Sequence, residues 1–142
     1  MNIADMTDLL NADLRNEYKH MNFYLYHSTS LVGLHAEEYK EIFAEEAKSE
    51  MGHIQQFSNL LWGLGVKPNH YGSEIVLFTN VRQALQYAHD MEAEVVANYA
   101  KRLAQCDELL EGADRRWIEV FLEDQLMHSR QDVDRFARLL AE

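Results

Sequence analysis

The sequence has few of the residues that interrupt helices or form covalent cross-links. Among its 142 residues are one proline, Pro68, and six glycines. Proline removes a backbone donor and glycine destabilises helix interiors, so a chain with so few of both can form long, uninterrupted helices. The single cysteine, Cys106, excludes an internal disulfide. This cysteine content is typical of a protein from a reducing compartment, and we expect a cytoplasmic location.

Long apolar runs and an excess of basic residues are also absent. No stretch approaches the roughly 20 apolar residues of a membrane span, so no membrane partner is expected. The N-terminal segment MNIADMTDLL contains acids and no basic region, unlike a signal peptide. The formal net charge of −11 argues against nucleic acid as a partner, because phosphate binding needs a basic surface. An acidic surface attracts cations, although in most proteins it only aids solubility.

Four stretches show the 3.6-residue apolar period of amphipathic helices rather than the alternation of strands. The length and a hydrophobic content of 47% are those of one domain, residues 1–142, with a sizeable core. The expected fold class is therefore all-α, a four-helix bundle. The predicted helices run from about Ile3 to Leu31, Glu37 to Leu64, Val81 to Cys106 and Asp114 to Leu140.

The first two predicted helices carry a distinctive set of polar residues. Glu17 is followed 33 positions later by Glu50, which opens the segment Glu50-Met51-Gly52-His53. A carboxylate and an imidazole at positions i and i+3 lie on one helix face, about one turn apart. Tyr24 follows Glu17 by seven positions on the same face.

The last two predicted helices repeat this pattern. Glu92 is followed 33 positions later by Gln125, which opens Gln125-Leu126-Met127-His128, and Tyr99 follows Glu92 by seven positions. Glu94 is the alternative glutamate on this helix, but only Glu92 shares the apolar stripe. The matched spacing predicts two helical hairpins of similar design.

The hairpin turns should lie midway between the paired residues. Gly33 lies midway between Glu17 and Glu50, and the polar segment 107–112 covers the midpoint of the second pair. The join at 65–80 is long for a connection between neighbouring helices. Extended, it can span about 50 Å at about 3.3 Å per residue. A lengthwise crossover needs about 40 Å, for roughly 26 helical residues at 1.5 Å each. We therefore predict a crossover, with the apolar residues 75–78 packed against the outside of the bundle or a partner.

Glu17, Glu50, Glu92 and Gln125 occupy positions where the helical pattern expects apolar residues. Several carboxylates buried at one level repel each other unless they share cations or protons. Two divalent ions would remove this repulsion, and oxygen with imidazole ligands suits iron, manganese or zinc. The alternative is a metal-free polar core. The short Glu-x-x-His motif alone is weak support for a metal site, because it also occurs a second time, at Glu17-x-x-His20. His20 is more typical of packing or surface residues than of a ligand.

Tyr24 is the candidate catalytic residue. Together with Tyr99 it could hydrogen-bond a ligating carboxylate or pass electrons. The alternative is that both tyrosines are ordinary core residues, as buried tyrosines at helical spacing usually are.

These residues resemble the ferritin-like superfamily, and bacterioferritin most of all. The first half is the more similar: Glu17 with Tyr24, then EMGH at 50–53, LLWGLG at 60–65 and Pro68. The second half matches through Glu92 with Tyr99 and through Asp124-Gln125-x-x-His128. The resemblance covers nearly the whole chain. It implies a ferritin-like fold of two antiparallel helical hairpins joined by a long crossover.

The resemblance also implies a dinuclear iron centre with six ligands. Terminal ligands would be Glu17 and Glu92, bridging ligands Glu50 and the residue at 125, and His53 and His128 would bind one iron each. The family has glutamate where this chain has Gln125, and glutamine offers one neutral oxygen. One metal should then bind less tightly, or an added anion should bridge. The chain is expected to be a ferroxidase if the site is active despite Gln125.

Two further expectations come from bacterioferritin. Met51 stands where that family has a methionine that binds haem b between two subunits, so Met51 is the candidate haem ligand. The sequence ends at Glu142 without the short fifth helix that helps to close shells in the family. A homodimer or larger homo-oligomer is expected.

The expected function is the binding of iron and the oxidation of Fe(II) with O2 or H2O2, for iron storage or detoxification. One alternative is a dinuclear oxidase or peroxidase similar to rubrerythrin that does not store iron, with manganese or zinc as other metals. A second alternative is a non-catalytic helical bundle.

Overall fold

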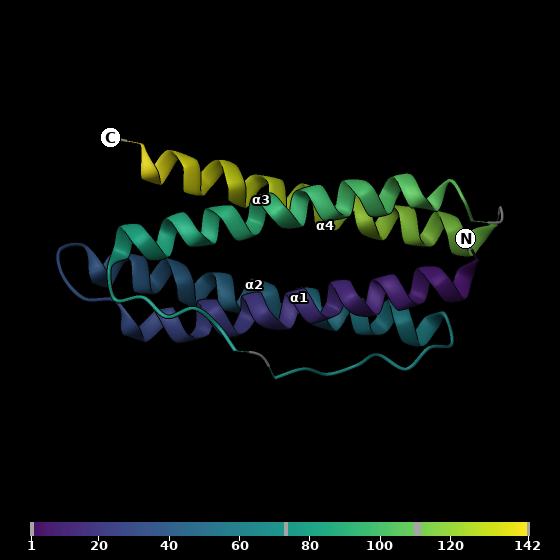
Figure 1. Cartoon of the computed structure of the whole chain (residues 1–142), viewed down its shortest axis with the longest axis horizontal. Coiled ribbons are helices and arrows are strands. Elements are labelled where there is room, and N and C mark those ends of the chain that lie inside the picture. Colours follow the sequence, from purple (N-terminus) through teal and green to yellow (C-terminus); the bar gives the residue numbers. More distant parts are fainter. Residues whose placement is uncertain (1, 73, 110–111, 142) are drawn as a thin grey trace. The chain divides into compact units, whose positions relative to one another are not determined.

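The computed structural model describes residues 2–72, 74–109 and 112–141, and its regular structure is helical (Figure 1). The helix bounds differ from the predicted ones by no more than a residue at either end. In the part of the chain that is described, no helix has the length and apolarity needed to cross a membrane. The helices are α1 (Ile3–Ser30), α2 (Ala36–Gly63), α3 (Val81–Cys106) and α4 (Ala113–Leu140).

The chain forms two compact units. One comprises Leu9–Ala84, which includes most of α1, all of α2 and the connection that follows it. The other comprises the residues up to Asp8 together with Leu85–Glu142, which include most of α3 and all of α4.

In the Leu9–Ala84 unit, α1 and α2 form an antiparallel hairpin. Gly33 lies in the turn with a φ of 100°, a left-handed conformation that glycine adopts without strain. Further from the turn, Phe43 of α2 packs on α1, with ring centroids 5.7 Å from Tyr24 and 6.2 Å from Phe23. Tyr24 and Phe43 lie about equally many residues from the turn, and the same is true of Glu17 and Glu50. The hairpin register is therefore the one that the spacing predicts.

The connection after α2 runs lengthwise beside α1 (Figure 1). Near the start of α1, the backbone N–H of Asn69 donates to Oδ1 of Asn11 at 2.9 Å. Near the end of α1, the N–H of Val32 donates to the carbonyl oxygen of Thr79 at 3.0 Å. These contacts confirm the predicted crossover.

His27 fastens the last part of this connection to α1. Its Nδ1 lies 2.7 Å from the carbonyl oxygen of Phe23, and its Nε2 accepts a 2.9 Å hydrogen bond from the N–H of Phe78. This arrangement requires a neutral imidazole protonated on Nδ1, and burial lowers the pKa of His27 below 6.5. Phe78 packs against Phe23 at 6.4 Å, whereas Val76 and Leu77 remain exposed.

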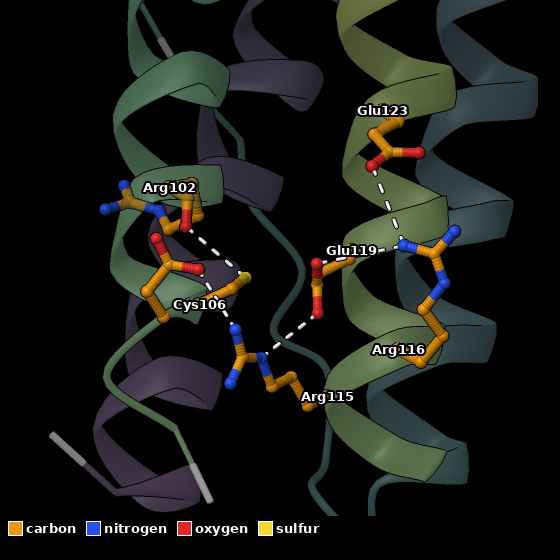
Figure 2. Close-up of polar contacts among 7 residues, drawn as sticks. Arg102, Cys106, Arg115, Arg116, Glu119 and Glu123 are labelled. Atoms are coloured by element: carbon orange, nitrogen blue, oxygen red, sulfur yellow. Dashed lines mark hydrogen bonds and ion pairs between the residues drawn. The ribbon is translucent and has the colours of Figure 1, made fainter. Parts of the chain in front are cut away.

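In the second unit, Arg115 near the beginning of α4 forms an ion pair with Asp107, which directly follows α3, and a second ion pair within α4 (Figure 2). Arg115 donates from Nη2 to Asp107 Oδ1 at 3.0 Å and from Nε to Glu119 Oε1 at 3.1 Å. The contact with Asp107 brings the beginning of α4 beside the end of α3, as an antiparallel hairpin requires. Of the predicted turn at 107–112, residues 110–111 lie outside the described part of the chain.

Cys106 lies beside this ion-pair group and is fully buried. Its Sγ donates to the carbonyl oxygen of Arg102 at 3.4 Å (Figure 2). Burial, and then the charge of Glu119, raise the pKa of the Cys106 thiol to about 11. The thiol is thus protonated and poorly reactive near neutral pH.

Candidate metal centre

The α1–α2 hairpin brings Glu17, Glu50 and His53 together. The Nδ1 atom of His53 lies 3.5 Å from Oε2 of Glu17 and 3.4 Å from Oε2 of Glu50. All three side chains are buried, with exposed fractions of 1%, 2% and 6%. Glu50 and His53 are one turn apart on α2, and Glu17 faces them from α1. The three ligating atoms lie within 4.8 Å of one another.

Burial, hydrogen bonds and nearby charges together determine the pKa of Glu17 in this cluster. Burial alone would raise the pKa of Glu17. Hydrogen bonds with Glu50 and His53, and then the charges of His20 and His53, outweigh burial and lower the pKa of Glu17 from 4.5 to about 2. Glu17 is therefore ionised near neutral pH and can bind a cation without first losing a proton.

The donor set fits a divalent transition metal. Carboxylate oxygen and imidazole nitrogen are the ligands that iron, zinc and manganese sites use. Two donors bound about 2.1 Å from a tetrahedral metal ion lie about 3.4 Å apart. The distances from His53 to the two carboxylates match this separation, so the side chains need little rearrangement to bind an ion.

His20 lies beside the same cluster. It is 6% exposed and one turn after Glu17 on α1. A ring nitrogen of His20 and a carboxylate oxygen of Glu50 lie within 4.8 Å of each other. The sequence favours packing or the surface for this residue, and its burial is compatible with packing.

On α3, Glu92 is 1% exposed, whereas Glu94 is exposed. The helical phase therefore agrees with the choice of Glu92. On α4, Gln125 is fully buried. Its buried stripe also contains Ile118, Leu122, Ser129 and Phe136.

His128 is more exposed than the other candidate ligands. Its side chain is 49% exposed, and its Nε2 lies 3.7 Å from Oδ1 of Asp124. Among the described residues, no group of potential metal-binding side chains includes His128. Its role as a ligand stays a prediction.

Asp132 was not identified from the sequence. A carboxylate oxygen of Asp132 lies within 4.8 Å of one of Glu92, within the same unit. Asp132 follows Gln125 by seven residues, which is two helical turns and places both on one face of α4. This spacing is the signal that could have revealed it.

Tyr24 and Tyr99, with exposed fractions of 0% and 2%, are both buried. Tyr24 packs edge-on against Phe23 at 5.7 Å, so the structure gives it at least a packing role. Met51 is 49% exposed on α2 and thus accessible from outside this chain. Catalysis by Tyr24 and haem binding by Met51 stay predictions.

The comparisons with known proteins agree with this architecture. The chain matches the Ferritin family, described as a ferritin-like domain, over residues 7–140. No curated protein matches it in sequence. Among solved structures, it is similar to one described as ferritin-like, diiron-carboxylate proteins from Bacillus anthracis str. Ames. The sequence identity is 25%, the match covers 97% of this chain and 96% of that chain, and the TM-score is 0.86.

This likeness confirms the predicted fold class, the ferritin-like four-helix bundle of two hairpins and a crossover. The matched range, residues 7–140, covers most of the chain. The chain therefore belongs to the ferritin family of ferritin-like domains.

Proposed function

We propose that this protein binds iron at a dinuclear centre and oxidises Fe(II) with O2 or H2O2, for iron storage or detoxification. The observation that carries the proposal is the buried cluster of Glu17, Glu50 and His53, whose donor atoms lie 3.4–3.5 Å apart. The solved relative described as a diiron-carboxylate protein supports two metal ions rather than one.

Carboxylate ligands favour this reaction because anionic oxygen donors stabilise Fe(III) more than Fe(II). Two Fe(II) ions give up one electron each. With two protons, these electrons reduce O2 to H2O2, or H2O2 to two waters.

Residues of α3 and α4 complete the centre in this proposal. Glu92 acts as a terminal carboxylate, Gln125 offers a neutral oxygen and His128 an imidazole. Because one carboxylate fewer faces the two cations, the position beside Gln125 and His128 binds iron more weakly. The His128 side chain is half exposed, and in this proposal its imidazole turns inward to bind the ion.

The test is iron oxidation by the metal-free protein. Fe(II) is added without oxygen, the bound iron is counted, and O2 or H2O2 is then supplied while Fe(III) absorption is followed. Glu50→Ala should abolish tight binding and oxidation. Glu41→Ala, which removes an exposed glutamate of the same helix, is the matched control. Oxidation by Glu50→Ala at the wild-type rate would contradict the proposal.

A further inference from the structure

The end of the connection between α2 and α3 is fastened to α1 through the backbone of Phe78. Its N–H donates to Nε2 of His27 at 2.9 Å, and its carbonyl oxygen accepts a hydrogen bond from Oγ of Ser30 at 3.2 Å. The preceding side chains, Val76 and Leu77, are 46% and 57% exposed and contribute little packing. This stretch therefore depends heavily on the backbone contacts of Phe78, as expected for a segment that can open locally.

The contact with His27 requires one protonation state of the imidazole. Nδ1 of His27 lies 2.7 Å from the carbonyl oxygen of Phe23 and therefore carries the proton, which leaves Nε2 as the acceptor for the N–H of Phe78. An imidazolium is a donor at both nitrogens. After protonation, two N–H groups would face each other at Nε2 in place of the hydrogen bond.

The surroundings of His27 in this unit are unfavourable for a positive charge. The side chain is fully buried, and the rings that contact it are Phe23 and Tyr26 from α1, Phe43 from α2 and Phe78 from the connection. Tyr26 is the titratable one, and phenols ionise near roughly pH 10, above the range in which histidines titrate. Among the described contacts of His27, no carboxylate is present to pair with an imidazolium. Burial, opposed by the hydrogen bond with the Phe23 carbonyl, lowers the pKa of His27 below 6.5.

We propose that His27 is a pH-sensitive latch, whose protonation releases Phe78 from α1 and opens the end of the connection while α1 and α2 stay folded. In the closed state the ring centroid of Phe78 lies 6.4 Å from that of Phe23. Phe23 is 1% exposed and packs edge-on against Tyr24 at 5.7 Å. The opening therefore uncovers an aromatic surface next to the candidate catalytic tyrosine. The latch stands apart from the proposed function, because none of its residues is a candidate metal ligand.

The test is the protection of the Phe78 amide against hydrogen exchange, measured by NMR at a series of pH values. Neutral His27 keeps the latch closed above pH 6.5, and this effect declines as the pH falls towards the pKa of His27 in the closed state. Because opening takes up one proton, the protection factor should fall by up to about tenfold per pH unit in that range. The amide of Asn69, which donates to Asn11 at the other end of the connection, should keep its protection.

Two variants identify the group that titrates. His27→Gln offers an acceptor that does not titrate, so the protection of the Phe78 amide should no longer depend on pH. His70→Gln removes an exposed histidine of the same connection and should keep the pH dependence of the wild type.

A protection factor of Phe78 that stays constant as the pH falls below 6.5 would overturn the proposal. The wild-type pH dependence in His27→Gln would overturn it as well. A parallel loss of protection at Asn69 would show unfolding of the unit rather than a latch. If His27→Gln fails to fold, the imidazole signals of the wild type decide: titration of His27 below pH 6.5 supports the latch, and titration at or above 6.5 overturns it.

Discussion

The replacement Glu50→Gln separates the metal role of Glu50 from its contribution to the fold. Glutamine has nearly the same shape, and its amide N–H can donate the hydrogen bond between this position and Glu17. In the metal-free protein, the change thus keeps a hydrogen bond and removes an ionisable group that is only 2% exposed. We expect an unchanged free energy of unfolding, or an increase of about 1 kcal/mol.

Metal binding should respond in the opposite direction. Breaking a buried charge pair by removing one partner costs about 3–5 kcal/mol, which corresponds to roughly two to four orders of magnitude in affinity. Competition against a chromophoric chelator gives the affinity for Zn²⁺ or Co²⁺, and thermal unfolding of the metal-free protein gives the stability. A variant that binds metal as tightly as the wild type would refute the ligand role. A metal-free variant with a free energy of unfolding lower by about 3 kcal/mol would show that Glu50 stabilises the fold itself.

Three further predictions concern other parts of the chain. Gln125→Glu should strengthen the weaker metal position several-fold or more and speed Fe(II) oxidation; two equal, unchanged sites in calorimetric titrations would contradict this. His27→Phe should destabilise the protein by about 1–3 kcal/mol, because the N–H of Phe78 loses its acceptor, as measured by urea unfolding. Burial lowers the pKa of His27 below 6.5, so neutral His27 should stabilise the fold above about pH 6.5. This stabilisation should decline as the pH falls from there towards the pKa of His27 in the folded protein. A stability difference between variant and wild type that does not change with pH would contradict this. Cys106 should react with iodoacetamide near pH 8 only on unfolding, and rapid labelling of the native protein would disprove its burial.

The helices and the register of the first hairpin follow from the sequence because both depend on local rules. The apolar period defined each helix, and the position of Gly33, close to the midpoint between Glu17 and Glu50, indicated the turn. The length of the 65–80 segment predicted a crossover. Its path beside α1 depends on individual contacts, such as the Phe78 N–H to His27, that no periodicity encodes.

The metal cluster was partly predictable, for a different reason. Glu17, Glu50 and His53 interrupt the apolar stripes, and burying them requires a compensating partner. Asp132 was missed because a lone aspartate at helical spacing is usually a surface residue. Whether such a residue faces a carboxylate on a neighbouring helix depends on helix rotation and side-chain direction, which spacing alone does not determine.

The most direct test of the metal centre is anomalous diffraction at the iron edge from crystals soaked in Fe(II) without oxygen. The account predicts a strong peak bounded by Glu17, Glu50 and His53, and a weaker second peak beside Gln125. Absence of any iron peak at the Glu17–Glu50–His53 cluster, in crystals that bind iron elsewhere or not at all, would contradict it.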